Sequence, residues 1–209
     1  MRPKDKPVVR DEPTFIEAAR RAQIVGCAIE AIAELGYERA SLAEIAKRAG
    51  VSKSVISYYF AGKDELMDQV VTDVYTAAAL FMLPRIQAET TASGALRAFI
   101  TSNVEFIGGH RSDVQAVIEI ISSARTAEGQ PRFDVKGLEQ SISDLEQHIL
   151  RRGQETGEFR AFSTAVMAVA IRQAIDALGP RLHAYPDLDV DEYAVELATL
   201  FEHATRKQN

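Results

Sequence analysis

The sequence has no tryptophan and only one cysteine among its 209 residues. A single cysteine excludes an internal disulfide, so we expect a reducing, cytoplasmic setting. Cys27 lies in a helical, apolar stretch, which favours a small core residue over a redox sensor. No uninterrupted apolar run approaches the length that crosses a bilayer, and the first thirteen residues are charged rather than signal-like. The sequence therefore predicts a protein without membrane contact.

Motifs typical of enzymes are also missing from the sequence. No glycine-rich dinucleotide loop, phosphate loop or GxSxG nucleophile motif occurs. The four histidines are His110, His148, His183 and His203, and they show neither metal-ligand spacing nor a cysteine partner. We therefore expect no catalysis, no cofactor and no bound metal. Side chains that converge only in the folded protein remain the alternative, which turnover of a bound ligand would reveal.

Strand-like alternation is absent, whereas apolar residues recur throughout at spacings of three and four, which predicts an all-α fold. The net charge of −6 is unevenly distributed. Residues 1–63 contain eleven Lys and Arg against eight Asp and Glu, whereas residues 64–209 contain thirteen against twenty-two. A basic head on an acidic body is the asymmetry expected when only the head meets phosphates.

Two short helices joined by a tight turn are predicted within the stretch SLAEIAKRAGVSKSVISYYFAGK, which begins at Ser41. Ser41 and Glu44 have capping-box spacing at the start of the first helix. Gly50 occupies the turn because glycine tolerates positive φ, and Ser52 can cap the second helix. This pattern predicts a helix-turn-helix.

The second of these helices buries one stripe and exposes the other. Ile56 and Phe60 share its inward face. Its outward face presents short polar groups, one cation and one aromatic hydroxyl: Lys53, Ser54, Ser57 and Tyr58. A helix of this kind fits the DNA major groove.

The same positions resemble the TetR family of transcriptional regulators from about Phe15 to Val71. The matching positions are Ile32-Ala33-Glu34-Leu35-Gly36-Tyr37, Ala40-Ser41-Leu42, Ile45-Ala46, Ala49-Gly50-Val51-Ser52, Ile56, Tyr58-Tyr59-Phe60, Lys63 and Glu65-Leu66. Ser57 departs from the tyrosine that the family often carries there. The resemblance implies a DNA-binding head and a C-terminal helical domain that binds a small effector and dimerises.

The expected DNA contacts are Ser41, Lys53, Ser54, Val55, Ser57, Tyr58, Tyr59 and Lys63. Ser41 stands at a helix start, where a phosphate is favoured. Tyr58 and Lys63 are expected to hold phosphates, and the remaining residues to read base edges, Val55 through a thymine methyl. Packing into the core remains the alternative for Tyr58 and Tyr59.

Three segments are expected along the chain: a flexible basic arm at 1–13, the helix-turn-helix domain at 14–62, and an effector-binding and dimerisation domain at 63–209. A long helix is predicted from Lys63 to about Leu83, where Pro84 disturbs or ends it. The other predicted helices cover residues 14–35, 92–108, 112–124, 134–155, 163–178 and 190–207.

An effector is expected between the middle helices of the second domain, as the resemblance implies. The candidate lining comprises Phe99, Asn103, Phe106, Ile107, Val117, Glu119, Ile121, Ile142, Met167, Ile171, Gln173 and Asp176. Core filling remains the alternative at each apolar position. An apolar pocket with few polar groups suits a lipophilic molecule, or a cationic one if an acid lies inside.

Residues 163–178 are apolar almost all round, so this helix must be covered on both sides. We therefore expect a homodimer, and the resemblance implies that the two C-terminal helices form its interface. A monomeric bundle is the alternative. The predicted function is a transcriptional repressor that binds a near-palindromic operator and is released by a small lipophilic effector. A helical module whose basic head binds a protein partner is the alternative.

Overall fold

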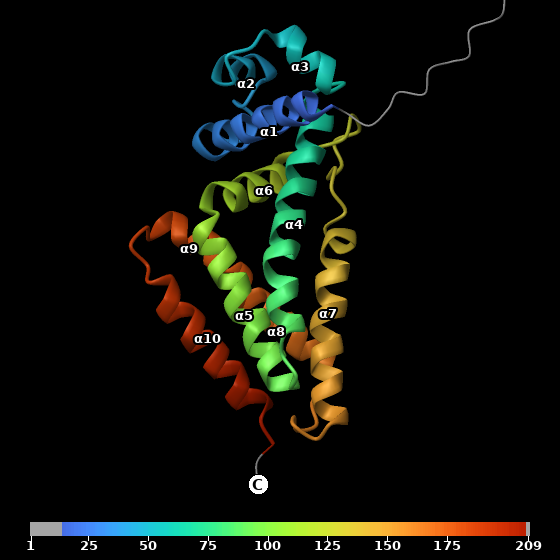
Figure 1. Ribbon diagram of the computed structural model, residues 1–209, viewed down its shortest axis with the longest axis vertical. Helices are drawn as coiled ribbons and strands as arrows, with labels where there is room; N and C mark the ends of the chain where they lie inside the picture. The colour runs from blue at the N-terminus through green and yellow to red at the C-terminus, as the bar shows by residue number, and fades with distance from the viewer. Residues whose placement is uncertain (1–13, 208–209) are drawn as a thin grey trace, which may run out of the picture.

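The computed structural model describes residues 14–207, apart from the side chains of residues 135, 136, 138, 139 and 141. Within that range the chain forms ten α-helices and no β-strand, which confirms the expected fold class (Figure 1). The basic arm predicted at 1–13 lies outside the described residues. The helices are α1 (Phe15–Leu35), α2 (Leu42–Arg48), α3 (Lys53–Tyr59), α4 (Lys63–Gln87), α5 (Ala92–Gly109), α6 (Arg111–Ser123), α7 (Val135–Glu155), α8 (Thr164–Asp176), α9 (Leu178–Ala184) and α10 (Val190–Thr205).

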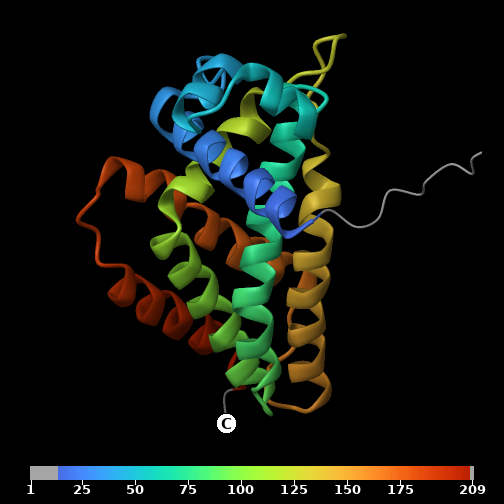
Figure 2. The ribbon, with the colours of Figure 1, turned by 45° about the horizontal axis from the view of Figure 1, so that its top comes forward.

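We call residues 14–62 the head and residues 63–207 the body. In the head, α2 and α3 lie across α1 at one end of the molecule (Figures 1 and 2). Thr14 and Glu17 form a capping box at the start of α1: the Glu17 N–H donates to Thr14 Oγ1, and the Thr14 N–H donates to the Glu17 carboxylate. Gly50 takes φ +64° in the turn between α2 and α3, a conformation that favours glycine.

Helix α4 connects the two regions and belongs to both cores. Its first half contributes Leu66, Met67 and Val70 to the apolar core of the head. Its last turns contribute Met82 and Ile86 to the core of the body. The predicted boundary at residue 63 therefore marks where the head's short helices end, although the head's core continues into the body.

The body is built around α5, which packs against α4, α7, α8 and α10. Residues on several faces of α5 are buried, including Leu96, Phe99 and Val104. Helix α6 crosses beneath α1, where its Ala116 and Ile120 enter the core of the head (Figure 1). Head and body thus meet along both α4 and α6.

The structure corrects two helix boundaries that depend on proline. Helix α4 continues through Pro84 to Gln87, so the prediction that it ends near Leu83 is wrong. Pro84 lies in the last turn, where its missing N–H breaks one hydrogen bond and the remaining turn still closes through Ala88 N–H to Pro84 O at 3.1 Å. Residues 163–178 were expected to form one helix, whereas α8 ends at Asp176 and α9 begins at Leu178. Pro180 lies in the first turn of α9, where proline is tolerated.

The structure also corrects two predicted caps. Ser41 caps α2, since its hydroxyl accepts from the Glu44 N–H at 3.2 Å, but the Glu44 carboxylate pairs with Arg48 instead of completing a capping box. Ser52 occupies the N-cap position of α3 without a side-chain cap hydrogen bond. Its hydroxyl lies 2.7 Å from that of Ser54.

Contrary to expectation, one described helix, α4, is long and apolar enough to cross a membrane by length and composition. It packs against α1, α5 and α6 within the described chain. The length and composition of α4 are therefore weak evidence for membrane insertion.

Candidate DNA-binding surface and effector cavity

Helix α3 exposes the face that the sequence predicts. Ile56 and Phe60 are 0% and 1% exposed and point into the core of the head. Side chains on the opposite face are exposed, and they include a cation and three hydroxyls: Lys53, Ser54, Ser57 and Tyr58. Because Ile56 and Phe60 fix the rotation of this short helix about its axis, its polar face is directed outward.

Polar ties from α1 hold α2 and α3 in place. Arg21 donates to the Tyr59 carbonyl at 2.7 Å and to Gln69 Oε1 at 2.8 Å, so it joins the end of α3 to α4. Its guanidinium also lies 4.3 Å from the centre of the Phe60 ring. Gln23 donates to the Ala49 carbonyl at 3.2 Å, beside the turn. These bonds satisfy carbonyl groups that short helices leave unpaired at their ends.

The remaining predicted DNA-contact residues have mixed environments. Val55 and Tyr59 are partly buried, and Tyr59 packs on the core of the head, as the alternative for it anticipated. Tyr58 is 69% exposed, and its hydroxyl donates to Glu17 Oε1 at 3.2 Å. The Ser57 hydroxyl donates to the Lys53 carbonyl at 3.2 Å. Ser41 is exposed at the start of α2.

Lys63 has an intramolecular partner that the sequence did not suggest. Its Nζ donates to the Tyr37 carbonyl at 2.6 Å and lies 4.1 Å from the centre of the Tyr37 ring. Burial lowers the pKa of Lys63, and the nearby Glu38 and Asp64 partly oppose that effect. One of its three N–H groups is thus used within the head, and its expected phosphate contact remains a prediction.

A cavity of about 360 Å³ lies in the upper part of the body; we call it the inner cavity. A volume of this size falls at the lower end of the range of small-molecule sites, about 300–1,000 Å³. The described residues that line it are mainly apolar and come from six helices: Val74, Tyr75, Ala78, Met82, Asn103, Phe106, Ile107, Val114, Val117, Ile118, Ile121, Ser122, Ile142, Arg172, Asp176 and Gly179.

Seven of the twelve predicted effector residues line the inner cavity: Asn103, Phe106, Ile107, Val117, Ile121, Ile142 and Asp176. The other five are corrected. Phe99 and Ile171 are fully buried in the body core, and Met167 packs against that core. Gln173 is exposed on α8. Glu119 accepts from Gln115 at 3.3 Å and lies near Gly36, on the side of α6 that faces α1.

The polar groups of the inner cavity are gathered at one corner. Arg172 Nε lies 3.0 Å from Asp176 Oδ1, and Arg172 Nη1 donates to Asn103 Oδ1 at 3.3 Å. Burial raises the pKa of Asp176, and the neighbouring Arg172 partly opposes that effect. Because Arg172 offsets the charge of Asp176, this corner does not favour a cationic ligand over a neutral one.

Helix α4 also lines the inner cavity, a contribution that was not predicted from the sequence. Val74, Ala78 and Met82 recur every four residues on one face of this helix. The same spacing runs through Leu66, Val70 and Val74, so an apolar stripe continued along α4 is the signal that could have indicated these residues.

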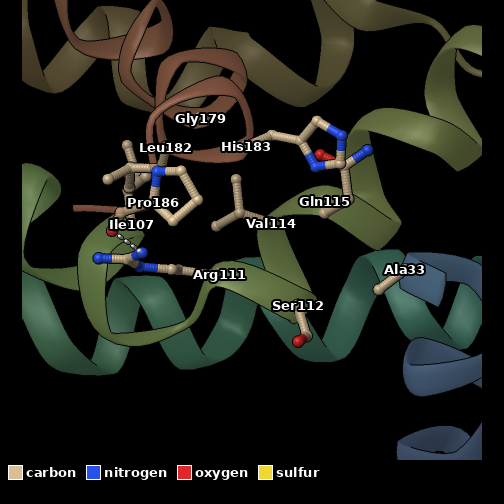
Figure 3. Close-up of a pocket in the computed structure, with 10 residues that line it drawn as sticks. All are labelled: Ala33, Ile107, Arg111, Ser112, Val114, Gln115, Gly179, Leu182, His183 and Pro186. Carbon is tan, nitrogen blue, oxygen red and sulfur yellow. Dashed lines mark hydrogen bonds between the residues drawn. The ribbon is translucent and has the colours of Figure 1, made fainter. Parts of the chain in front are cut away.

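A second cavity, of about 260 Å³, is lined by residues of α5, α6 and α9 and by one residue of α1; we call it the outer cavity. Figure 3 shows Arg111 beside Pro186, with Val114 and Gln115 projecting from α6 and Ala33 approaching from α1. Its lining comprises Ala33, Ile107, Arg111, Ser112, Val114, Gln115, Gly179, Leu182, His183 and Pro186. None of these residues except Ile107 was predicted as an effector contact.

The outer faces of α8 and α10 carry exposed apolar side chains. Val166 and Val169 on α8 are 69% and 62% exposed, and Val195 and Leu200 on α10 are 53% and 60% exposed. The other side of α8 is buried through Ile171 and its neighbours. Both sides of α8 were expected to be covered by other helices. Within the described chain only one side is covered.

The head has two short helices joined by a tight turn, the arrangement of a helix-turn-helix domain. The long helix α4 joins it to an all-α body that contains an apolar cavity. The model of "Bacterial regulatory proteins, tetR family" matches residues 24–70. The HTH-type transcriptional regulator BetI of Escherichia coli O45:K1 (strain S88 / ExPEC) is 37% identical over 82 residues, 39% of this chain. That match spans 42% of the relative, so it covers less than half of BetI.

Two solved structures share the fold along most of the chain. FadR from Bacillus subtilis in complex with stearoyl-CoA has a TM-score of 0.72 at 22% identity, covering 86% of this chain and 96% of that one. AibR in complex with isovaleryl coenzyme A and operator DNA has a TM-score of 0.72 at 20% identity, covering 87% and 97%. These comparisons support membership of the tetR family of bacterial regulatory proteins, whose model matches the head and the first turns of α4.

Proposed function

We propose that this protein is a ligand-responsive transcriptional regulator that binds double-stranded DNA through α3. The observation that carries the proposal is the exposed face of α3, with Lys53, Ser54 and Ser57 directed outward by the buried Ile56. Hydroxyls and one ammonium on a rigid helix suit base edges in a major groove. The operator DNA bound to AibR, a structure of the same fold, supports this assignment.

We further propose a homodimer through the exposed apolar faces of α8 and α10. Exposed valines and a leucine on two neighbouring surfaces are expected at an interface rather than in solvent. A two-fold dimer presents two recognition helices about 34 Å apart, which matches half-sites one helical turn apart in a near-palindromic operator. Sedimentation tests this: Val169→Glu with Leu200→Glu should give monomers, whereas the matched control Leu80→Glu, on the exposed face of α4, should stay dimeric.

The effector in this proposal is a small lipophilic molecule bound in the inner cavity, and its binding releases the operator. The apolar lining and the internally paired Arg172 and Asp176 support a lipophilic ligand. FadR, which shares the fold, holds stearoyl-CoA. Shifting the DNA-binding state from 99:1 to 1:99 requires about 5.5 kcal/mol of differential binding between the two states.

Selection of bound sequences from random duplex DNA tests the function directly. We expect enrichment of an inverted repeat with half-sites about one helical turn apart. The double variant Lys53→Ala with Ser57→Ala should lose the enrichment, and the control Arg181→Ala, on the surface of the body, should keep it. If no sequence is enriched and duplex DNA is not retained at moderate salt, the regulator proposal fails and the alternative of a protein partner takes its place.

A further inference from the structure

The outer and inner cavities adjoin each other. Ile107, Val114 and Gly179 line both of them, one residue each from α5, α6 and α9. A Cβ atom at Gly179 would lie 3.1 Å from Ile118 Cδ1 and 3.4 Å from Val114 Cγ1. The two cavities are therefore separated by residues that they share, and Gly179 packs closely on the α6 side chains at this boundary.

The two cavities differ in charge. The charged residues lining the inner cavity, Arg172 and Asp176, form an ion pair with each other. In the outer cavity Arg111 is the one formally charged residue among the described lining, and no carboxylate accompanies it. His183, Gln115 and Ser112 add further hydrogen-bonding groups. An anionic group is thus favoured in the outer cavity, whereas the inner cavity favours apolar matter.

Arg111 is held in position for such a role. Its Nε donates to the Gly108 carbonyl at 3.2 Å, and its Nη1 donates to the Pro186 carbonyl at 2.8 Å (Figure 3). A guanidinium has five N–H groups, so these two bonds fix its plane beside the cavity and leave others for a ligand. A fixed guanidinium loses less entropy when it binds an anion than a mobile one does.

The outer cavity also touches the head. Ala33 of α1 lines it together with residues of α5, α6 and α9. A group bound there contacts the head directly, whereas a group confined to the inner cavity reaches the head only through α4 and α6. Occupancy of the outer cavity is therefore well placed to change how α1 sits on the body.

We propose that the two cavities form one two-lobed site for an amphiphilic anion. The apolar chain of the ligand lies in the inner cavity, and its carboxylate or phosphate end lies at Arg111 in the outer cavity. This inference deepens the effector function proposed above, because it assigns the chemical class of the ligand and the residue that binds its charged end.

A matched pair of probes tests the proposal by calorimetry on the full chain: decanoate and 1-decanol, which have the same chain length and differ in charge. We expect decanoate to bind the wild type at least tenfold more tightly, since a charge-assisted hydrogen bond to a guanidinium is stronger than a neutral one. Arg111→Gln should bring the two affinities close together while leaving that of decanol unchanged. The control Arg181→Gln, on the same side but outside the lining, should keep the preference.

Two further variants assign the lobes. Ala78→Phe narrows the inner cavity and should weaken both probes, whereas Ala33→Phe fills the outer cavity and should weaken decanoate alone. Thermal unfolding of each variant checks its fold, and Arg111→Gln decides the outcome if Ala33→Phe does not fold. Equal affinities in the wild type, no binding of either probe, or equal weakening of both by Arg111→Gln would each overturn the proposal.

These outcomes are independent of DNA binding, so the two proposals can fail separately. Arg111-dependent preference for decanoate without any selected operator would support the two-lobed site and refute the regulator. An enriched operator without that preference would support the regulator and refute the two-lobed site.

Discussion

The head and the body of this protein place their candidate functional groups on opposite sides of their cores. In the head the groups proposed to act are those that α3 leaves outside the core, such as Lys53 and Ser57. In the body the core is hollow, and the groups proposed to act face inward, such as Phe106 and Val117. A helix that recognises DNA through its exposed face has to be held rigidly, whereas a ligand site requires space that the packing of side chains leaves open.

The two regions also obtain their rigidity differently. Helices α2 and α3 have seven residues each, too short to be stable alone in water. They depend on buried contacts and on ties from Arg21 and Gln23. The helices of the body are mostly longer, and α5 is covered on several sides. Loss of one large side chain should therefore harm the function of the head more than that of the body.

The largest expected effect tests this difference. Phe60→Ala removes a fully buried ring that also lies under the Arg21 guanidinium, and it should lower the free energy of unfolding by about 3–5 kcal/mol. Phe99→Ala, the matched change in the body, should cost a similar amount. Urea denaturation measures both, and hydrogen exchange locates the loss. We expect Phe60→Ala to abolish DNA retention at a temperature where Phe99→Ala retains it; equal retention would contradict the comparison.

Lys63→Ala has the next largest expected effect. If the ammonium reaches a phosphate beyond its bond to the Tyr37 carbonyl, the variant should bind all duplexes about tenfold more weakly at low salt, about 1.4 kcal/mol. The slope of log affinity against log salt should fall by about one. Lys53→Ala, on the groove face of α3, should instead change the preference among sequences. An unchanged slope would assign Lys63 to the structure of the head alone.

Much of the head could be predicted from the sequence because its signals are local. The Thr14 and Glu17 capping box joins residues three apart, and the face of α3 follows from the positions of Ile56 and Phe60. A local pattern fails to predict the hydrogen bond when a side chain from elsewhere binds one of the two partners. Arg48, held by Glu34 at 2.8 Å, takes the Glu44 carboxylate that was expected to complete the cap at Ser41.

The inner cavity could be predicted only in part. The periodicity of apolar residues distinguishes buried side chains from exposed ones, but it does not show whether a buried side chain fills the core or lines a cavity. Phe99 and Phe106 stand seven residues apart on α5 and give the same apolar signal, yet only Phe106 lines the inner cavity. Of the residues that line the outer cavity, only Ile107 was predicted as an effector contact. Its lining combines Ala33 of α1 with Pro186, which are separated by most of the chain.

The connection between α6 and α7 provides a smaller test of how the body holds the head. This segment rises beside the first turns of α4, where Arg132 pairs with Asp64 at 3.2 Å and with Asp68 at 2.5 Å (Figure 2). Phe133 packs on the core of the head. Arg132→Met should lower the free energy of unfolding by about 1 kcal/mol, because the pair is partly exposed.

A double-mutant cycle with Asp68→Asn measures the interaction of Arg132 with Asp68. Arg125→Met is the control, since Arg125 lies in the same segment and donates to the adjacent Ala124 carbonyl. Its effect should stay within about 0.5 kcal/mol. A coupling energy near zero would mean that Phe133, and not the ion pair, fastens this segment to α4.

The smallest expected effect concerns a cap that, unlike those of the head, comes from far along the chain. The Glu158 carboxylate accepts from the Ala92 N–H at 3.1 Å and the Ser93 N–H at 3.0 Å at the start of α5. Burial acts to raise the pKa of Glu158, but the hydrogen bonds from Ser93, Ala92 and Thr156 outweigh it and hold this pKa below the ordinary 4.5.

A lowered pKa means that the folded state favours the carboxylate, so the stabilisation is present at neutral pH and is lost as the pH falls through the folded-state value. Glu158→Gln should lower the free energy of unfolding by about 0.5–1 kcal/mol at pH 7, and the difference from the wild type should shrink below pH 4.5. Thr91→Ala, which removes the local cap on Gly94, should show a loss that does not vary with pH. Denaturation of both variants between pH 3 and 7 makes the comparison, with the exposed Glu155→Gln as the control for a loss of charge alone. If the Glu158→Gln difference were constant over that range, the distant carboxylate would act as a neutral acceptor, and the cap on α5 would resemble the local caps of the head.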